Sequence, residues 1–137
     1  MRNILFVGKD VGFIRYIGIF TRRFGPEYGF NSEIVTNWDE AKVKTQPRGP
    51  WSNTVDMALV DCRLDDAAEI LNSLKSNEVP AMAIGFSAGG DEQLLTVRDN
   101  QLASLRESGY QTAIFEGPEP DSFLKALCGA GMAKELL

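Results

Sequence analysis

The chain has 137 residues, a formal net charge of −5 and no histidine. This length fits one domain with a proper core, so we expect a single domain over residues 1–137. The lack of histidine excludes His-based acid–base catalysis, Ser-His-Asp triads and the commonest zinc sites. The net charge argues against non-specific nucleic-acid binding, because the local cluster Arg15, Arg22 and Arg23 is too small to reverse it.

The composition is that of an ordinary globular protein, and no apolar run approaches the length of a membrane span. The N-terminus goes directly into a strand-like run and lacks the long apolar region of a signal peptide, so we expect a cytoplasmic location. Cys62 and Cys128 lie far apart in apolar contexts. This pattern favours buried reduced thiols over a disulfide or a metal site.

The first part of the chain predicts a buried strand followed by a helix. The apolar run at residues 4–7 has strand length, and Gly8, Lys9 and Asp10 break it. The apolar residues of the helix recur at helical spacing, and we expect it to end at Gly25-Pro26. These positions are Phe13, Ile17, Phe20 and Phe24, and the apolar surface is widened by Ile14, Tyr16 and Ile19. We favour a broad packing face over a contact surface for a partner.

A second strand and a short helix follow. Residues 30–36 alternate loosely, which is typical of a strand near the sheet edge. Asn37 or Thr36 is placed to cap a helix over residues 38–44. Residues 45–54 contain two prolines and a glycine without periodicity, so we expect an irregular surface loop with Trp51 packed back on the domain.

The segment 56–64 is a short apolar run bracketed by aspartates. Its middle, residues 57–60, predicts a buried parallel strand. Asp61 then falls at the carboxyl edge of the sheet, where open α/β folds place their sites. Asp65 and Asp66 are nearer to the following apolar run and better placed to cap the next helix, which leaves Asp61 available for another role.

The alternation continues to the end of the chain. We expect a helix over 65–75, a strand over 81–84, a loop over 85–90, a helix from 91 that ends at 108–109, a strand over 112–115 and a last helix from 121 or 122 through 127. Five strands alternating with five helical segments predict an α/β fold with three layers, in which helices cover both faces of a five-stranded parallel sheet. At this length the flavodoxin-like strand order is the natural candidate.

Within this class the sequence resembles the receiver domain of two-component response regulators over nearly the whole chain. The resemblance rests on residues 56–61 as the phosphoacceptor strand, 79–84 as the fourth strand and 109–115 as the glycine-led entry to the fifth. It implies a signal-transduction domain with Asp61 in the place of the phosphoacceptor. The family's partner surface, on the fourth helix, fifth strand and fifth helix, would lie near residues 94–105 and 123–127.

The positions that hold magnesium in the family differ here. Its members carry an acidic pair after the first strand, and these positions are Gly8 and Lys9, with Asp10 as the acidic residue nearby. A short loop is expected to bring Lys9 over the same pocket as Asp61, so that the ammonium stands where magnesium neutralises the carboxylate. The alternative is that Lys9 points into solvent.

The phosphoryl-binding positions differ as well. The family's hydroxyl residue at the end of the fourth strand falls on Gly85, and Ser87 would serve only if the strand ran two residues longer. The family's lysine after the fifth strand aligns with Glu116, and its aromatic switch position with Ala113. A phosphoryl group on Asp61 would face the charge of Glu116, which disfavours it.

We therefore expect a degenerate, or pseudo-, receiver that is not an enzyme, needs no cofactor and acts by protein–protein interaction. The resemblance suggests a histidine kinase or another signalling protein as partner; neither nucleic acid nor membrane is expected, and a homodimer is compatible with the sequence. Exposed residues for such contacts would include Arg98, Arg106 and Lys125.

Two alternatives stay open. One is a working phosphoacceptor that uses Asp61, Asp10 and Ser87 with an atypical magnesium site. The other is a small flavodoxin-like nucleotide-binding protein or enzyme that uses the glycines of residues 85–90, although this loop matches neither GxxxxGK[ST] nor GxGxxG.

Overall fold

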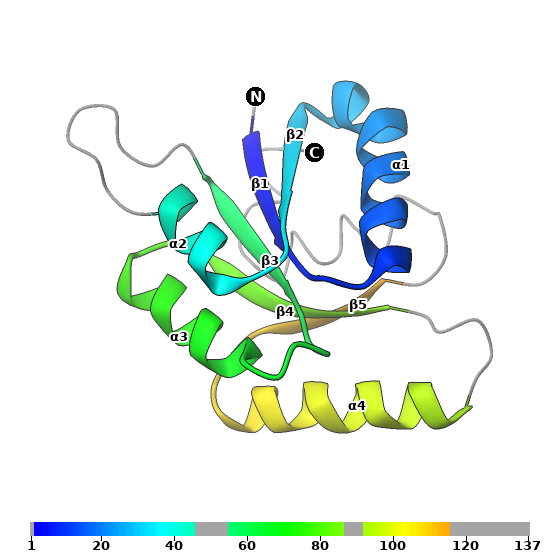
Figure 1. Ribbon diagram of the computed structural model, residues 1–137, viewed down its shortest axis with the longest axis vertical. Coiled ribbons are helices and arrows are strands. Elements are labelled where there is room, and N and C mark those ends of the chain that lie inside the picture. The colour runs from blue at the N-terminus through cyan, green and yellow to red at the C-terminus, as the bar shows by residue number, and fades with distance from the viewer. Residues whose placement is uncertain (1, 46–54, 87–91, 116–137) are drawn as a thin grey trace.

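The computed structural model describes residues 2–45, 55–86 and 92–115. Its strands form one parallel sheet in the order β2-β1-β3-β4-β5 (Figure 1). The strands are β1 (Arg2–Val7), β2 (Phe30–Val35), β3 (Met57–Asp61), β4 (Ala81–Phe86) and β5 (Thr112–Phe115). The helices are α1 (Val11–Tyr28), α2 (Trp38–Thr45), α3 (Ala67–Ser76) and α4 (Glu92–Glu107). This is the flavodoxin-like order that the sequence predicts, with β2 at the edge.

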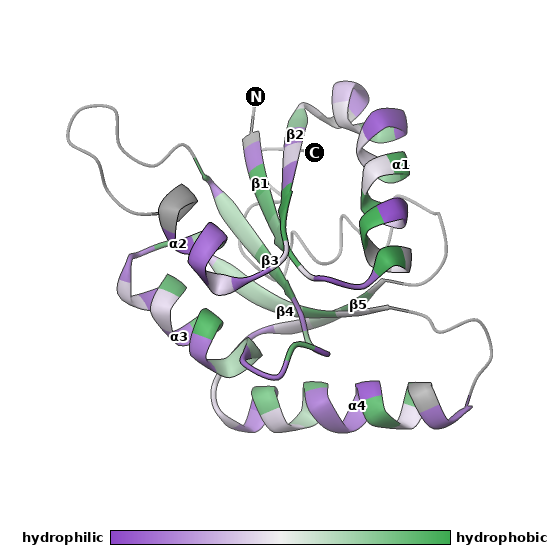
Figure 2. Cartoon of the chain, in the orientation of Figure 1, coloured by the Kyte–Doolittle hydropathy of each residue, from purple (hydrophilic) through white to green (hydrophobic). Residues whose placement is uncertain are grey.

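The two faces of the sheet carry separate hydrophobic clusters because successive strand side chains point in opposite directions. In β1, Ile4 and Phe6 join a cluster with α1, whereas Leu5 and Val7 join a cluster with α2, α3 and α4. β3 and β4 divide their side chains in the same way, so the described helices cover both faces. Figure 2 shows the hydrophobic residues gathered in the central strands, with hydrophilic bands along α2 and α4.

Helix α1 is longer than the sequence indicates. It runs through Gly25-Pro26 to Tyr28, so the expected end at that dipeptide is wrong. Pro26 lies in the last turn, where the missing N–H removes one hydrogen bond without breaking a long continuation. The helix ends before Gly29, whose φ of 74° is the left-handed conformation that glycine adopts at helix C-termini.

The other boundaries lie close to the expected ones. The Glu40 N–H donates to Asn37 Oδ1 at 2.9 Å, which confirms Asn37 as the cap of α2. Asp66 occupies the N-cap of α3, but its side chain makes no capping hydrogen bond. β4 extends two residues further than expected because Gly85 and Phe86 pair with Ile114 and Phe115 of β5. This meets the length condition stated for Ser87, which itself lies outside the described residues.

Several expectations lie outside the described residues: Ser87 and the rest of the glycine loop, Trp51 with residues 46–54, Glu116, the last helix with Lys125, and Cys128. None of the described helices combines the length and apolarity that crossing a bilayer requires.

Candidate functional site

The candidate site lies at the carboxyl edge of the sheet, between β1 and β3. The strand order reverses between these two strands, and open α/β sheets bind ligands at such a point. Lys9 and Asp10 follow β1, Asp61 ends β3, and Arg63 and Leu64 lie in the loop after it. These five residues line a pocket of about 230 Å³.

Asp61 is held in a tight turn at the end of β3. Only 2% of the Asp61 surface is exposed to solvent. The Leu64 N–H donates to the Asp61 carbonyl oxygen at 3.2 Å, and the Arg63 N–H donates to Asp61 Oδ1 at 3.0 Å. A carboxylate that accepts from the backbone two residues on forms an Asx-turn. The turn brings the Arg63 side chain back over the strand end.

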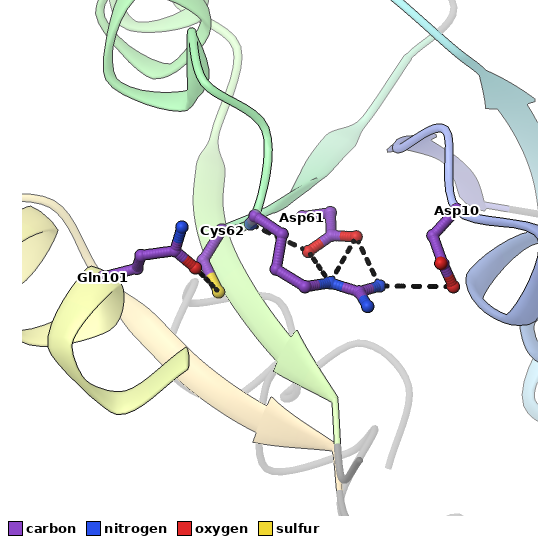
Figure 3. Close-up of polar contacts among 5 residues, drawn as sticks. Asp10, Asp61, Cys62 and Gln101 are labelled. Carbon is purple, nitrogen blue, oxygen red and sulfur yellow. Dashed lines mark hydrogen bonds and ion pairs between the residues drawn. The ribbon is translucent and has the colours of Figure 1, made fainter. Parts of the chain in front are cut away.

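The Arg63 guanidinium donates to both carboxylate oxygens of Asp61. Figure 3 marks these contacts as dashed lines at the labelled Asp61 carboxylate. Its Nε donates to Oδ1 and to Oδ2 at 3.2 Å each, and its Nη2 donates to Oδ2 at 2.8 Å. The same Nη2 lies 3.5 Å from Asp10 Oδ2. The hydrogen bond to Asp61 raises the pKa of the Arg63 guanidinium; partial burial lowers it, and the charges of Asp61 and Asp10 raise it. One cation thus bridges two carboxylates.

The expected pairing of Lys9 with Asp61 is wrong. Lys9 lines the same pocket with an exposed side chain, but within the described ranges the ion pair to Asp61 comes from Arg63. The physical reason is the short turn, which places a planar guanidinium with several donors directly against the carboxylate. Lys9 would have to compete with this bidentate contact from another strand.

The pocket does not fit the magnesium ion that the resemblance implies. Asp10 and Asp61 are its two carboxylates, and both face the Arg63 guanidinium. Gly8 has no side chain, and its N–H donates to the Val35 carbonyl oxygen of β2 at 3.0 Å. Among the described residues, no group of three His, Cys, Asp or Glu side chains is placed to hold a metal.

The position of the family's hydroxyl residue, Gly85, is covered by α4. A Cβ atom at Gly85 would lie 2.8 Å from Cγ and Cδ of Arg98 and 2.9 Å from Cδ1 of Leu102. Arg98 is only 9% exposed, so the expectation that it offers an exposed contact residue is wrong. Its aliphatic part fills the space that a side chain at Gly85 would need. Arg106 is exposed as expected, and its guanidinium donates to Thr112 Oγ1.

Cys62 follows Asp61 and is a buried free thiol, as the sequence indicates. Its Sγ lies 3.9 Å from Gln101 Oε1 of α4 (Figure 3). Burial raises the pKa of this thiol from 9.0 to about 12, with the Asp61 charge adding to the rise and the charges of Arg63 and Arg98 opposing it. The folded protein therefore keeps this thiol protonated well above pH 9.0.

This raised pKa predicts a loss of stability in alkali. Between pH 9.0 and about 12 the unfolded chain releases the Cys62 proton while the folded chain keeps it, so rising pH favours unfolding. From pH 8 to pH 10 we expect this group to cost about 1 kcal/mol. Urea unfolding of wild type and Cys62→Ala at both pH values measures it. A fall of equal size in both proteins would contradict the prediction.

The chain matches no family model and no curated protein at a significant level. Solved structures do match it. A response regulator receiver protein from Burkholderia phymatum superimposes with a TM-score of 0.59 at 19% identity, covering 97% of this chain and 98% of that one. FixJ-N gives 0.55 at 16% identity, covering 100% and 98%. A structure named adenylate cyclase from Rhodopirellula baltica gives 0.58 at 15% identity, covering 98% and 90%.

These similarities extend over the whole of the described sheet and its helices, at identities that establish the fold alone. The five-stranded parallel sheet with helices agrees with the fold of these structures. The chain has the flavodoxin-like fold of response-regulator receiver domains.

Proposed function

We propose that this protein is a degenerate receiver: a regulatory domain that acts by binding other proteins and does not accept a phosphoryl group at Asp61. The observation that carries the proposal is the bidentate contact of Arg63 with both oxygens of the buried Asp61 carboxylate. Receiver-like signalling is supported by the fold.

The geometry supports this proposal in two ways. A carboxylate that attacks a phosphoryl group needs an available oxygen, and here both oxygens accept hydrogen bonds from one guanidinium. Phosphoryl transfer also depends on a cation that neutralises the developing charge, commonly a metal ion bound by the attacking site. Arg63 already supplies the neutralising charge to Asp61 and lies within 3.5 Å of Asp10.

The resemblance to receiver domains favours a protein-binding surface on α4, β5 and the expected last helix, near residues 94–105 and 123–127. The described part of this surface carries one large exposed apolar residue, Val97, which is 51% exposed. A regulatory domain without phosphoryl chemistry must transmit its signal through such contacts. The class of partner is therefore a protein, with neither nucleic acid nor membrane required.

We expect acetyl phosphate with magnesium to leave the protein unmodified. The readout is the intact mass, and amide NMR spectra with beryllofluoride and magnesium report binding independently of covalent stability. A receiver with known phosphoacceptor activity in the same reaction controls for the reagents.

Asp61→Asn is the matched variant for this experiment. A gain of one phosphoryl group in the wild type that disappears in Asp61→Asn would overturn the proposal and establish a working phosphoacceptor with an atypical site. Unchanged masses and spectra in both proteins would support it.

A further inference from the structure

The outer face of α1 carries a surface that the carboxyl-edge site does not use. Val11, Arg15, Ile19 and Arg22 recur at three- to four-residue spacing and share one side of the helix. Val11 is 67% exposed and Ile19 63%, and these are two of the three large apolar residues exposed in the described ranges. Ile14 and Tyr16, by contrast, pack against the core. Packing of α1 on the sheet therefore does not explain why an isoleucine occupies the exposed position 19.

The same face carries two positive charges, those of Arg15 and Arg22. Residues 11–26 contain three arginines and no acidic residue, in a protein with a net charge of −5. Within the described part of the chain, Arg15 and Arg22 have no side-chain hydrogen bond or ion pair, and Arg23 lies over the Phe24 ring at 5.0 Å. None of the arginines lies in the last turn of α1, where cations offset the helix dipole. Contacts among the described residues therefore do not account for Arg15 and Arg22.

We propose that Val11, Arg15, Ile19 and Arg22 form a docking surface for an acidic amphipathic helix of a partner protein. The proposal rests on the proposed function in taking protein contacts as the domain's mode of action. Val11 and Ile19 are eight residues apart, about 12 Å along the helix. A partner helix with apolar residues two turns apart matches this spacing, and carboxylates beside them match Arg15 and Arg22.

The residue types favour a carboxylate-bearing protein over other anions. Both cations of this surface, Arg15 and Arg22, are arginine, whose planar guanidinium binds a carboxylate in bidentate fashion. Nucleic acid and anionic membranes attract proteins through larger basic clusters, and the remainder of this chain is acidic. The aromatic residues that anchor interfacial helices in lipid face the core here, as Tyr16, Phe20 and Phe24 show.

The test uses a fluorescent synthetic helical peptide with leucines along one face and glutamates beside them. A second peptide has lysine in place of each glutamate. By fluorescence anisotropy, we expect the glutamate peptide to bind the wild type at least about tenfold more tightly than the lysine peptide, as two exposed ion pairs allow. Arg15→Glu/Arg22→Glu should abolish this preference, and Ile19→Ser should weaken binding of the glutamate peptide.

Lys42→Glu/Lys75→Glu is the matched control. It changes the net charge by the same amount through exposed residues of α2 and α3, on the other face of the sheet, and should keep the peptide preference. An equal loss in this control, or equal affinity of wild type for both peptides, would overturn the proposal. Two further results would also overturn the proposal. One is that the wild type floats with phosphatidylserine vesicles and the arginine variant does not. The other is that the wild type self-associates in the ultracentrifuge and the arginine variant does not. These measurements do not involve Asp61. A failure of the docking proposal can therefore be told apart from a failure of the proposed function, which phosphorylation of Asp61 would show.

Discussion

Replacing Arg63 with alanine should lower the free energy of unfolding by about 2 kcal/mol at neutral pH. The substitution removes the guanidinium from a carboxylate whose side chain is only 3% exposed. Breaking a buried pair costs about 3–5 kcal/mol, whereas exposed pairs contribute at most about 1 kcal/mol. Arg63 is 39% exposed, so water can reach its place and the expected cost lies between these limits. Urea unfolding measures it.

A double-mutant cycle assigns this cost to the Arg63–Asp61 contact. Asp61→Asn removes the charge that Arg63 neutralises, so Arg63→Ala should cost much less in that background. Arg63→Lys keeps the charge but not the bidentate geometry and should recover part of the stability. Additive effects of the two substitutions would show that Arg63 acts through some other contact.

The fold was predictable because its signals are carried by many residues. Apolar runs such as residues 4–7 and 57–60 are too short for helices and are buried on both faces, as parallel strands between helices must be. The helix that begins after Asp10 has its apolar residues at helical spacing, and only its end was misplaced at Gly25-Pro26. From sequence alone, a proline in the last turn of a helix looks the same as a proline just after the helix end, so the pattern does not fix the last residue.

The site was predictable in place but not in pairing. Asp61 could be placed at the carboxyl edge because the strand before it was clear. The role of Arg63 depends on a turn in which the Arg63 N–H binds Asp61 Oδ1, and one hydrogen bond of this kind leaves no periodic pattern. The signal that existed was an arginine two residues after a strand-end aspartate.

Arg98 offered a clearer signal. It precedes Leu102 by four residues and Leu105 by seven, so it shares their buried stripe on α4. A long side chain on such a stripe needs space on the sheet below, and Gly85 provides it. Gly85 and Arg98 together predict this packing, because a glycine on the strand leaves room for a large side chain on the helix above it.

Gly85→Ser introduces a hydroxyl at the position where the resemblance to receiver domains implies one. It should destabilise the protein by about 2 kcal/mol, because overpacking usually costs about 1–3 kcal/mol. Its Cβ would lie 2.8 Å from the middle of the Arg98 side chain and 2.9 Å from Leu102, so α4 must shift or both side chains must leave their present rotamers. Urea unfolding at neutral pH gives the cost.

Gly18→Ala is the matched control, because a Cβ atom at Gly18 in α1 meets no atom within 4 Å. It should stabilise the protein by about 0.5–1 kcal/mol through helix propensity. Shortening the opposing side chain by Arg98→Ala should remove most of the cost of Gly85→Ser, since Cγ and Cδ of Arg98 account for two of the three close contacts. Two results would contradict this: Gly85→Ser costs nothing in the wild type, or it costs as much in the Arg98→Ala background as in the wild type. Either would show that Arg98 does not exclude a side chain from position 85. The lack of a hydroxyl at that position would then have no packing cause.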